Sequence, residues 1–391
     1  MSFPLKELER YNAMSKIKVL QLHPRYNIRR SSISDLGEQI FKALPSEQYT
    51  TVNGFFSGRP AEGEPVSCAD HSIYFEFTEK QLKGLRLYVL WKLYKYLKKE
   101  KFDVVICNRY KPVNVLMTLA SFMNIPLCIG IVHGFGDYDR PYRRNQIRKR
   151  INKNWRFIGV SPAVQEYLVS LKAGFTSENT VSITNAIDTQ EAIKSQLSKE
   201  EARKTLHIPP CKILIGALGR LVPVKGHKYL IEAFAMISSD FLNVDLVIMG
   251  EGREKDSLQS LIDKYELKNR VHLIGFVEDA LTYVKGFDIW VMPSLEEGLG
   301  LALLEGMVGG LPVIASDVPA MRPLIQGANG ILVEPRNSRA LADAIMSVLE
   351  LTDDERLKLG ETALSYVENE HSLKEFQERY LDVISSAINK L

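Results

Sequence analysis

The chain has 391 residues, of which 45% are hydrophobic and 25% are charged, a composition typical of a globular protein with two domains. This composition excludes bulk disorder, a collagen-like repeat and a small fold held by disulfides. The net charge of +3 combines a basic first half with an acidic second half, because residues 1–190 hold 28 Lys and Arg against 17 Asp and Glu, whereas the rest hold 22 against 30.

The first half alternates short apolar runs with amphipathic helical stretches. The apolar runs predict strands at residues 17–22, 103–107, 127–132 and 157–160. Apolar residues at helical spacing predict helices near residues 34–44, 83–100, 113–123 and 162–171. Because the strands are rich in Val, Ile and Leu and show no regular polar alternation, they are typical of parallel strands that are covered on both faces.

The pattern restarts after residue 189. Strands are predicted at residues 213–218, 244–249, 271–274, 289–292 and 313–315, again with helical segments between them. Two successive β/α series predict an α/β protein with two doubly wound, Rossmann-like domains, at residues 1–188 and 189–371. A last helix follows at about residues 372–391. In such sheets ligands bind beyond the carboxyl ends of the strands, so polar residues there are the candidates for chemistry.

The cysteines and the N-terminus point to the cytoplasm. Cys68, Cys107, Cys128 and Cys211 lie far apart with no metal-ligand or CxxC spacing, which favours free thiols in a reducing compartment. The first residues lack an apolar core of signal-peptide length. A charge-free run at residues 112–136 divides into a helix, a turn and a strand. We therefore expect a cytoplasmic protein that crosses no membrane.

The densest cluster of candidate residues follows the strand predicted at 289–292. Gly298 and Gly300 precede an apolar helix, and such a junction presents free backbone N–H groups and the positive end of a helix dipole to an anion. Glu297 lies in the loop, where its carboxylate suits sugar hydroxyls; a solvated acidic turn is the simpler alternative. Glu305 lies among apolar neighbours on the helix, which disfavours a merely solvated side chain.

A second cluster carries cations. The first strand of the second half runs into Gly219, and Arg220 and Lys225 flank the loop before the next helix. An Arg fork and a Lys point charge at the mouth of a strand suit a diphosphate, although such residues are also common on a solvated surface. His133 ends a strand of the first half and is followed by glycine, which suits a cleft; a hydrogen-bonded structural histidine is the alternative.

These residues together resemble a retaining glycosyltransferase of family 4, which has the GT-B fold. The resemblance covers most of residues 185–385. Its motifs arrive in the family's order: Gly219-Arg220, Lys225-Gly226, Gly250-Glu251-Gly252, Gly275-Phe276-Val277, and the E-x7-E signature as Glu297 and Glu305. The resemblance implies transfer of a sugar from a UDP- or GDP-linked donor to an acceptor hydroxyl, with retention of the anomeric configuration. It also implies no metal and no further cofactor, because cationic side chains and helix dipoles stabilise the leaving group.

The resemblance implies a role for each matching residue. The catalytic set is His133, Arg220, Lys225 and Glu297, in which the two cations bind the donor diphosphate and the other two side chains touch the donor sugar. The donor-binding set is Gly219, Gly250, Val277, Gly298, Leu299, Gly300, Leu301 and Glu305. Within it the backbone at residue 277 meets the base, the N–H groups at 298–301 meet the sugar, and the carboxylate at 305 holds the ribose. The family's last helix crosses back to the first domain, which implies a place for residues 372–391.

One loop departs from the family pattern. The family often has a Gly-Gly loop near the diphosphate after its first strand, whereas residues 23–32 contain no glycine. Contacts from that loop cannot be carried over to this chain. Arg29 and Arg30 are candidates to replace them or to serve the acceptor.

The basic charge gathers at residues 80–160, which hold 18 Lys and Arg against 4 Asp and Glu. The segments 83–101 and 140–156 mix cations with apolar residues, and Arg143 and Arg144 are candidates for acceptor or surface contacts. Two solvated helices are the simpler alternative. The more specific alternative is that these segments bind an anionic partner. That partner would be the inner face of the cytoplasmic membrane, or a phosphorylated glycolipid acceptor of lipopolysaccharide or another cell-surface polysaccharide. No nucleic-acid-binding motif is present, so no nucleic acid is expected as a partner.

Two other functions stay open at this point. A non-catalytic nucleotide-sugar-binding or scaffold protein would bind the donor without turning it over. A glycoside hydrolase would use Glu297 and Glu305 as its carboxylate pair. The hydrolase does not explain the loop that carries Arg220 and Lys225.

Overall fold

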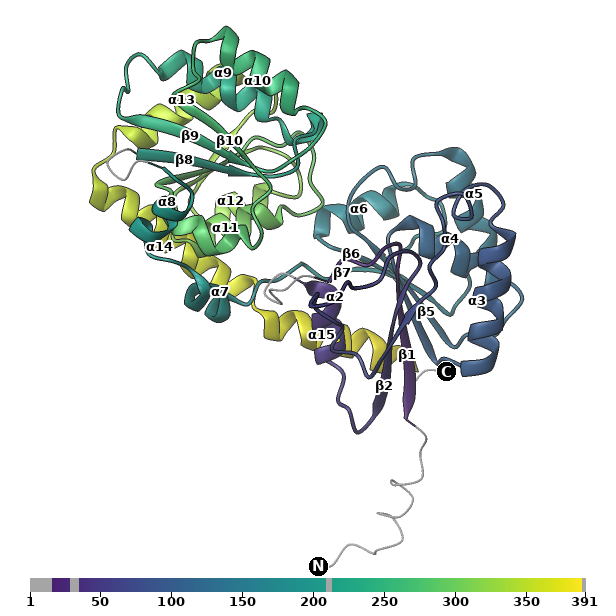
Figure 1. Ribbon diagram of the computed structural model, residues 1–391. Helices are drawn as coiled ribbons and strands as arrows, with labels where there is room; N and C mark the ends of the chain where they lie inside the picture. Colours follow the sequence, from purple (N-terminus) through teal and green to yellow (C-terminus); the bar gives the residue numbers. More distant parts are fainter. Residues whose placement is uncertain (1–15, 29–34, 209–212, 389–391) are drawn as a thin grey trace, which may run out of the picture.

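The computed structural model describes residues 16–28, 35–208 and 213–388. Two sheets, each with helices packed against its faces, form two domains that the chain connects twice (Figure 1). Arg29, Arg30 and Cys211 lie outside the described residues, so the predictions for them stay predictions. Two doubly wound Rossmann-like domains were expected, and both are present.

The first sheet has seven parallel strands in the order β3-β2-β1-β4-β5-β6-β7. They are β1 (Ile17–His23), β2 (Tyr49–Phe55), β3 (His71–Tyr74), β4 (Val104–Asn108), β5 (Leu127–Val132), β6 (Trp155–Gly159) and β7 (Thr180–Ser182). The helices of this domain are α2 (Leu36–Lys42), α3 (Leu87–Glu100), α4 (Tyr110–Leu119), α5 (Pro141–Arg150) and α6 (Pro162–Ser170). The strand order reverses between β1 and β4, so the carboxyl ends of these two strands border the crevice where such sheets bind ligands.

The second sheet has six parallel strands in the order β10-β9-β8-β11-β12-β13. They are β8 (Ile213–Leu218), β9 (Val244–Met249), β10 (Val271–Gly275), β11 (Ile289–Met292), β12 (Val313–Ser316) and β13 (Ile331–Val333). Its helices are α7 (Thr189–Ser195), α8 (Lys199–Thr205), α9 (His227–Ile237), α10 (Lys255–Lys264), α11 (Leu301–Val308), α12 (Arg322–Gly327), α13 (Ser338–Leu349) and α14 (Asp353–Glu370), with the 3₁₀ turns η2 (Pro223–Lys225) and η3 (Ala280–Gly286).

Every predicted strand is present, but β2, β3, β7 and β13 were not predicted. β2 shows why, because its sequence mixes Thr and Asn with apolar residues and yet it is almost wholly buried. Asn53 is fully buried and donates a hydrogen bond to the Glu38 carboxylate at 2.9 Å. Polar residues in a buried strand are tolerated when tertiary partners satisfy them, and periodicity does not reveal those partners.

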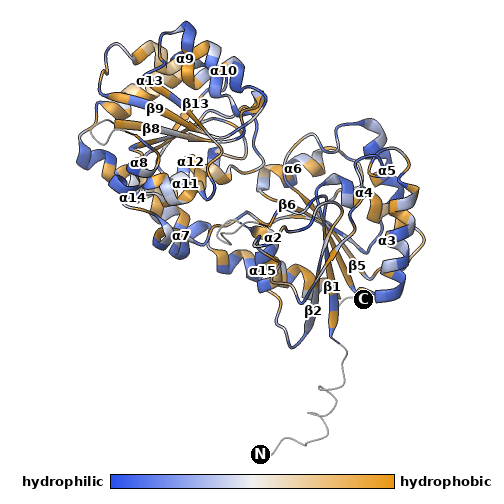
Figure 2. Ribbon diagram, in the orientation of Figure 1, coloured by the Kyte–Doolittle hydropathy of each residue, from blue (hydrophilic) through white to orange (hydrophobic). Residues whose placement is uncertain are grey.

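The central strands of both sheets are coloured as largely hydrophobic in Figure 2, and their apolar residues are buried in the core. In the first domain Trp155 stacks on Phe157 with ring centroids 5.6 Å apart. Cys107 and Cys128 lie within this core as free thiols, as predicted, whereas Cys68 is free and exposed.

The last helix, α15 (Leu373–Ile388), crosses back to the first domain. Its buried residues Phe376, Tyr380 and Ile384 belong to the core of the first sheet. The two crossings of the chain lie side by side, because the Ile187 N–H donates to the carbonyl oxygen of His371 at 3.3 Å. The implied place of this helix is therefore confirmed, while the domain boundary at residues 188 and 189 stays a prediction.

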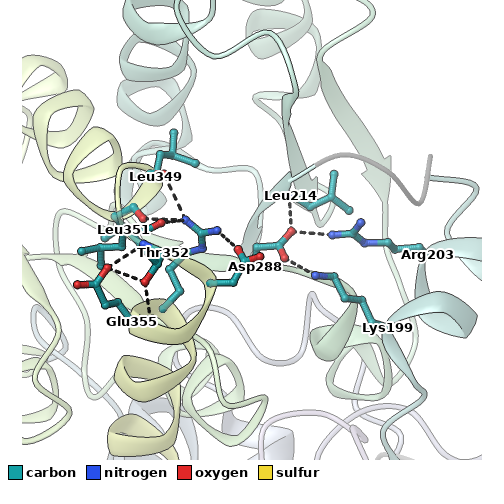
Figure 3. Close-up of polar contacts among 11 residues, drawn as sticks. Lys199, Arg203, Leu214, Asp288, Leu349, Leu351, Thr352 and Glu355 are labelled. Atoms are coloured by element: carbon teal, nitrogen blue, oxygen red, sulfur yellow. Dashed lines mark hydrogen bonds and ion pairs between the residues drawn. The ribbon is translucent and has the colours of Figure 1, made fainter.

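An ion-pair cluster fixes α8 against the second sheet (Figure 3). The Asp288 carboxylate, just before β11, accepts hydrogen bonds from Arg203 Nη2 at 2.6 Å and from the Leu214 N–H at 2.7 Å. Lys199 Nζ lies 2.5 Å from the same carboxylate. The Arg203 side chain is only 3% exposed, so its charge depends on this partner.

Candidate active site

The carboxyl ends of the strands of the second sheet border a cavity of about 810 Å³. It lies between the domains, because Tyr26, Ile28, Glu64 and Pro65 of the first domain line it as well. Six of the residues proposed from the sequence line it: Gly219, Arg220, Gly250, Val277, Leu301 and Glu305. The structure thus brings together residues that are up to 86 positions apart in the sequence.

The cation loop after β8 and the loop after β11 pack directly on each other. The Leu295 N–H donates to the carbonyl oxygen of Val224 at 2.8 Å. Gly226 has φ +68°, and a Cβ there would overlap the carbonyl oxygen of Pro293. Glycine is required at residue 226 both for its left-handed backbone and for this close approach.

Lys225 and Glu297, which were assigned to different parts of the donor, form an ion pair. Lys225 Nζ lies 2.5 Å from Glu297 Oε1, and the two side chains are 17% and 11% exposed. Arg220 is exposed and lines the cavity. The cavity is therefore bordered by one guanidinium, and a half-buried ion pair lies where the two loops meet.

Glu305 lies on the second turn of α11 and lines the cavity. The residue is 8% exposed, between the fully buried Leu304 and Met307. The sequence predicted that Glu305 is not a merely solvated surface group, and its burial agrees with that prediction.

His133 of the first domain lies against the loop after β11. A Cβ on Gly298 would overlap the carbonyl oxygen of His133, and the Ser161 hydroxyl donates to the carbonyl oxygen of Gly298 at 2.6 Å. The His133 ring Nε2 lies 3.1 Å from Asn108 Oδ1. Burial, and to a lesser extent the nearby Arg109, lower the pKa of His133 to about 4. The imidazole is therefore neutral at pH 7.

Arg109 is a candidate that the sequence analysis missed, because it lies close enough to His133 to act on the charge of that ring, although it does not line the cavity. It is exposed and follows β4, at the reversal of the strand order, with φ 66° and ψ 167°. This backbone region is almost restricted to glycine, and strain of this kind concentrates at functional sites. The rule that singled out His133, a polar residue just beyond a buried strand, would have found Arg109 too.

The loop after β1 reaches the cavity although it lacks the family's glycines. Tyr26 and Ile28 line the cavity, and the Tyr26 hydroxyl donates to the carbonyl oxygen of Pro65. The segment that carries Glu64 is thereby held against this loop. Tyr26 and Ile28 were not proposed from the sequence, because no motif singles them out.

The proposed acceptor residues on α5 are not simple solvated cations. Arg143 Nη1 donates to the carbonyl oxygen of Asp137 at 2.6 Å, and its guanidinium lies 3.9 Å from the centroid of the Tyr110 ring. The side chain is only 18% exposed. Arg144 is half-buried on the same helix. The segment 140–156 is also not one solvated helix, because α5 ends at Arg150 and the fully buried Trp155 begins β6.

Two family models match the chain. The model of "Glycosyltransferase Family 4" matches residues 51–191, and that of "Glycosyl transferases group 1" matches residues 198–365. An uncharacterized glycosyltransferase of Methanocaldococcus jannaschii is 34% identical over 264 residues, which cover 64% of this chain and 67% of that protein. The UDP-Gal:alpha-D-GlcNAc-diphosphoundecaprenol alpha-1,3-galactosyltransferase of Escherichia coli is 26% identical over 366 residues, which cover 88% of this chain and 90% of that protein.

Solved structures share the whole architecture. A glycosyltransferase from Rickettsia africae has a TM-score of 0.79 at 20% identity, with 97% of this chain and all of that chain covered. Anabaena HepE in complex with UDP and glucose has a TM-score of 0.76 at 21% identity, with 95% of this chain and all of that chain covered. At this identity the likeness shows the fold, and it confirms the predicted GT-B architecture. Taken with the two family models and the 34% identical relative, it shows that this chain belongs to the family 4 glycosyltransferases.

Proposed function

We propose that this glycosyltransferase moves a sugar from a nucleotide-sugar to a hydroxyl of a lipid-linked or cell-surface glycan, with retention of the anomeric configuration. The observation that carries the proposal is the cavity between the domains, which is bordered by Arg220 and by the carboxylate of Glu305. A nucleotide-sugar needs both kinds of group, a cation for its diphosphate and a hydrogen-bond acceptor for its ribose.

In this proposal the chemistry is leaving-group stabilisation. Arg220, Lys225 and the N–H groups at the start of α11 face the charge that develops on the diphosphate as its bond to the anomeric carbon breaks. The acceptor oxygen bonds to that carbon and passes its proton to an oxygen of the departing diphosphate, and the nucleoside diphosphate leaves with the electron pair of the broken bond. This positive charge supports a reaction without a metal or other cofactor.

Lys225 must change partners for this to happen. In the free protein its ammonium is paired with Glu297 at 2.5 Å. A bound diphosphate would draw Lys225 away, which frees the Glu297 carboxylate for hydroxyls of the donor sugar. Neutral His133 completes the sugar site from the first domain: if its Nε2–H donates to Asn108 Oδ1, its Nδ1 is left to accept a hydrogen bond.

A UDP-linked hexose is the favoured donor, with a GDP-linked sugar as the alternative. HepE is solved with UDP and glucose, and the Escherichia coli relative is named for UDP-Gal and a diphosphoundecaprenol-linked GlcNAc. A lipopolysaccharide core biosynthesis glycosyltransferase of Rhizobium meliloti is 28% identical over 185 residues. These names support a lipid-linked or lipopolysaccharide acceptor. Arg109, at the reversal of the first sheet, is the candidate to hold a phosphate of such an acceptor.

The test is a panel of UDP- and GDP-sugars in thermal unfolding, followed by transfer assays with the donors that protect. A saturable rise of the melting temperature identifies the donor. Transfer of labelled sugar to a lipid-linked acceptor, with the product configuration determined by NMR, distinguishes a retaining transferase from a non-catalytic binding protein. Inverted product, or protection without any turnover, would refute the corresponding part of the proposal.

A further inference from the structure

Helix α3 and the turn before it expose large apolar side chains that no other described element covers. Leu85 is 81% exposed, Leu87 69%, Tyr88 47% and Trp91 52%. Soluble proteins rarely expose apolar residues in such a contiguous group, and groups of this kind mark interaction surfaces. The four residues are called the α3 patch below.

The α3 patch continues into a row of lysines. Positions three and four apart lie on one face of a helix, so Trp91, Lys95 and Lys98 follow one another along the exposed side. Lys95 Nζ lies 4.0 Å from the centroid of the Trp91 ring. The opposite face of α3 is the buried one, where Leu93 and Leu97 pack into the core of the first sheet. The exposed face thus runs from apolar to cationic along the helix.

Negative charge is absent from this stretch. Residues 83–99 contain six Lys and Arg and no Asp or Glu. Arg86 and Lys92 are held internally, by the Asn114 side chain at 2.7 Å and the carbonyl oxygen of Phe75 at 3.0 Å. Lys95 and Lys98 are exposed, and the ammonium of each lies over an aromatic ring of the same helix. The free cations of the helix therefore stand beside its apolar patch.

From this arrangement we propose that the α3 patch and its lysines dock the protein on an anionic lipid surface. Leucines enter the acyl boundary, Tyr88 and Trp91 lie at the level of the headgroups, and Lys95 and Lys98 meet lipid phosphates. The contact is peripheral, because no helix among the described residues is long and apolar enough to cross a membrane. The docking proposal rests on the proposed function in one respect only, namely that docking brings the protein to its lipid-linked acceptor.

The position of the patch suits that purpose. Because α3 leads into β4, it runs antiparallel to the strands of its sheet and begins at their carboxyl ends (Figure 1). The apolar residues lie at that beginning, at the same end of the domain as Arg109 and His133. A lipid surface on α3 would therefore lie at the end of the domain where the proposed acceptor contacts are found.

Helix α5 provides a control that distinguishes docking through an apolar patch from attraction by positive charge alone. It carries five Arg and Lys, but Tyr142 is the one large apolar residue among its described side chains that is exposed. Charge without an apolar patch gives weak attraction that salt screens. Lys149 on α5 and Lys153 just after it are both exposed, so they provide a matched control for Lys95 and Lys98.

The protein contains its own fluorescent reporter. Trp155 and Trp290 are fully buried, so of the three tryptophans only Trp91 is exposed. Binding to vesicles of phosphatidylglycerol and phosphatidylcholine should shift the emission to shorter wavelength, and lipids brominated in their acyl chains should quench it. Phosphatidylcholine alone should give neither effect. The Trp91→Phe variant should lose the signal but still sediment with the vesicles.

Variants then test the two parts of the surface. Two double variants should each weaken sedimentation with the anionic vesicles about tenfold or more. Lys95→Gln/Lys98→Gln removes two lysines, each of which contributes roughly fivefold near such a surface. Leu87→Ser/Tyr88→Ser removes apolar side chains that enter the lipid. The control Lys149→Gln/Lys153→Gln should change sedimentation less than about threefold. Equal loss in the control, equal binding to phosphatidylcholine, or self-association through the patch in place of lipid binding would overturn the proposal. Donor protection against thermal unfolding, measured on the same proteins, tests the proposed function separately.

Discussion

The ion pair between Lys225 and Glu297 leads us to expect opposite effects when its two members are replaced: loss of the carboxylate should help the diphosphate to bind, and loss of the ammonium should harm catalysis. In the free protein the pair must break before Lys225 can bind a diphosphate. Unit charges at contact attract by several kcal/mol at an effective dielectric constant of 20, but desolvation and lost side-chain freedom cancel most of this. Since the side chains are 17% and 11% exposed, we assign the pair a net value of about 1 kcal/mol, at the upper end for surface pairs.

Glu297→Gln removes this competition and keeps the shape of the side chain. We therefore expect it to tighten the binding of the free nucleoside diphosphate about fivefold, which corresponds to about 1 kcal/mol. Turnover of the intact donor should fall, because the carboxylate no longer accepts hydrogen bonds from the sugar. Lys225→Ala should lower kcat/KM by about 10²-fold or more, roughly 3 kcal/mol of transition-state stabilisation.

Calorimetric titration of UDP and GDP into both variants and into the double variant checks this reasoning. Lys225→Ala should also lower the melting temperature by a few degrees, since it leaves the Glu297 carboxylate half-buried and without its cation. Weaker nucleoside diphosphate binding in Glu297→Gln would refute the competition between the carboxylate and the diphosphate. Strict additivity of the two substitutions in the double variant would show that the pair carries no coupling energy.

Four further predictions follow from the same geometry. Glu305→Ala should weaken binding of the free nucleoside diphosphate in calorimetry, because the ribose contact does not need the sugar; unchanged affinity would contradict the role. Arg109→Gly should raise the acceptor KM about tenfold while leaving donor affinity and the melting temperature at or above wild type, since glycine relieves about 1 kcal/mol of backbone strain; a lower melting temperature with normal acceptor KM would argue for a structural arginine. Arg203→Ala should cost about 3 kcal/mol in urea unfolding, because it removes the buried cation that is paired with the Asp288 carboxylate, and donor affinity measured on the same variant should not change. Burial lowers the pKa of His227 to about 4, so the unfolded state takes up the proton first as the pH falls below about 6.5 and stability is lost by about 1 kcal/mol per pH unit down to pH 4; His227→Gln should reduce that loss in urea titrations at pH 7 and pH 5, and an unchanged slope would disprove it.

Much of the site was visible in the sequence because it lies at the ends of strands. Parallel strands buried on both faces appear as short runs rich in Val, Ile and Leu without polar alternation, as in β5, β8 and β9, whose bounds agree with the prediction. The residue that follows such a run lies at the ligand-binding edge of the sheet. This local rule was enough to single out His133, Arg220 and the loop that holds Glu297.

Other features depend on partners far away in the chain. Lys225 and Glu297 are 72 positions apart, and no periodicity shows that they pair. Arg143 was expected as a surface cation, but its place under Tyr110 and Asp137 comes from the packing of α4 and α5 on one sheet.

The sequence by itself determined the order of elements and the kinds of side chain at each strand end, because both follow from local patterns of hydrophobicity and glycine. Only the tertiary structure decided which polar strands are buried, which charges are paired and which face of α3 is left uncovered. Burial of Asn53 in β2 depends on Glu38, and exposure of Trp91 depends on what packs beside α3. These properties are decided by contacts between distant segments, and a side chain's burial and partners follow from those contacts and not from its neighbours in the sequence.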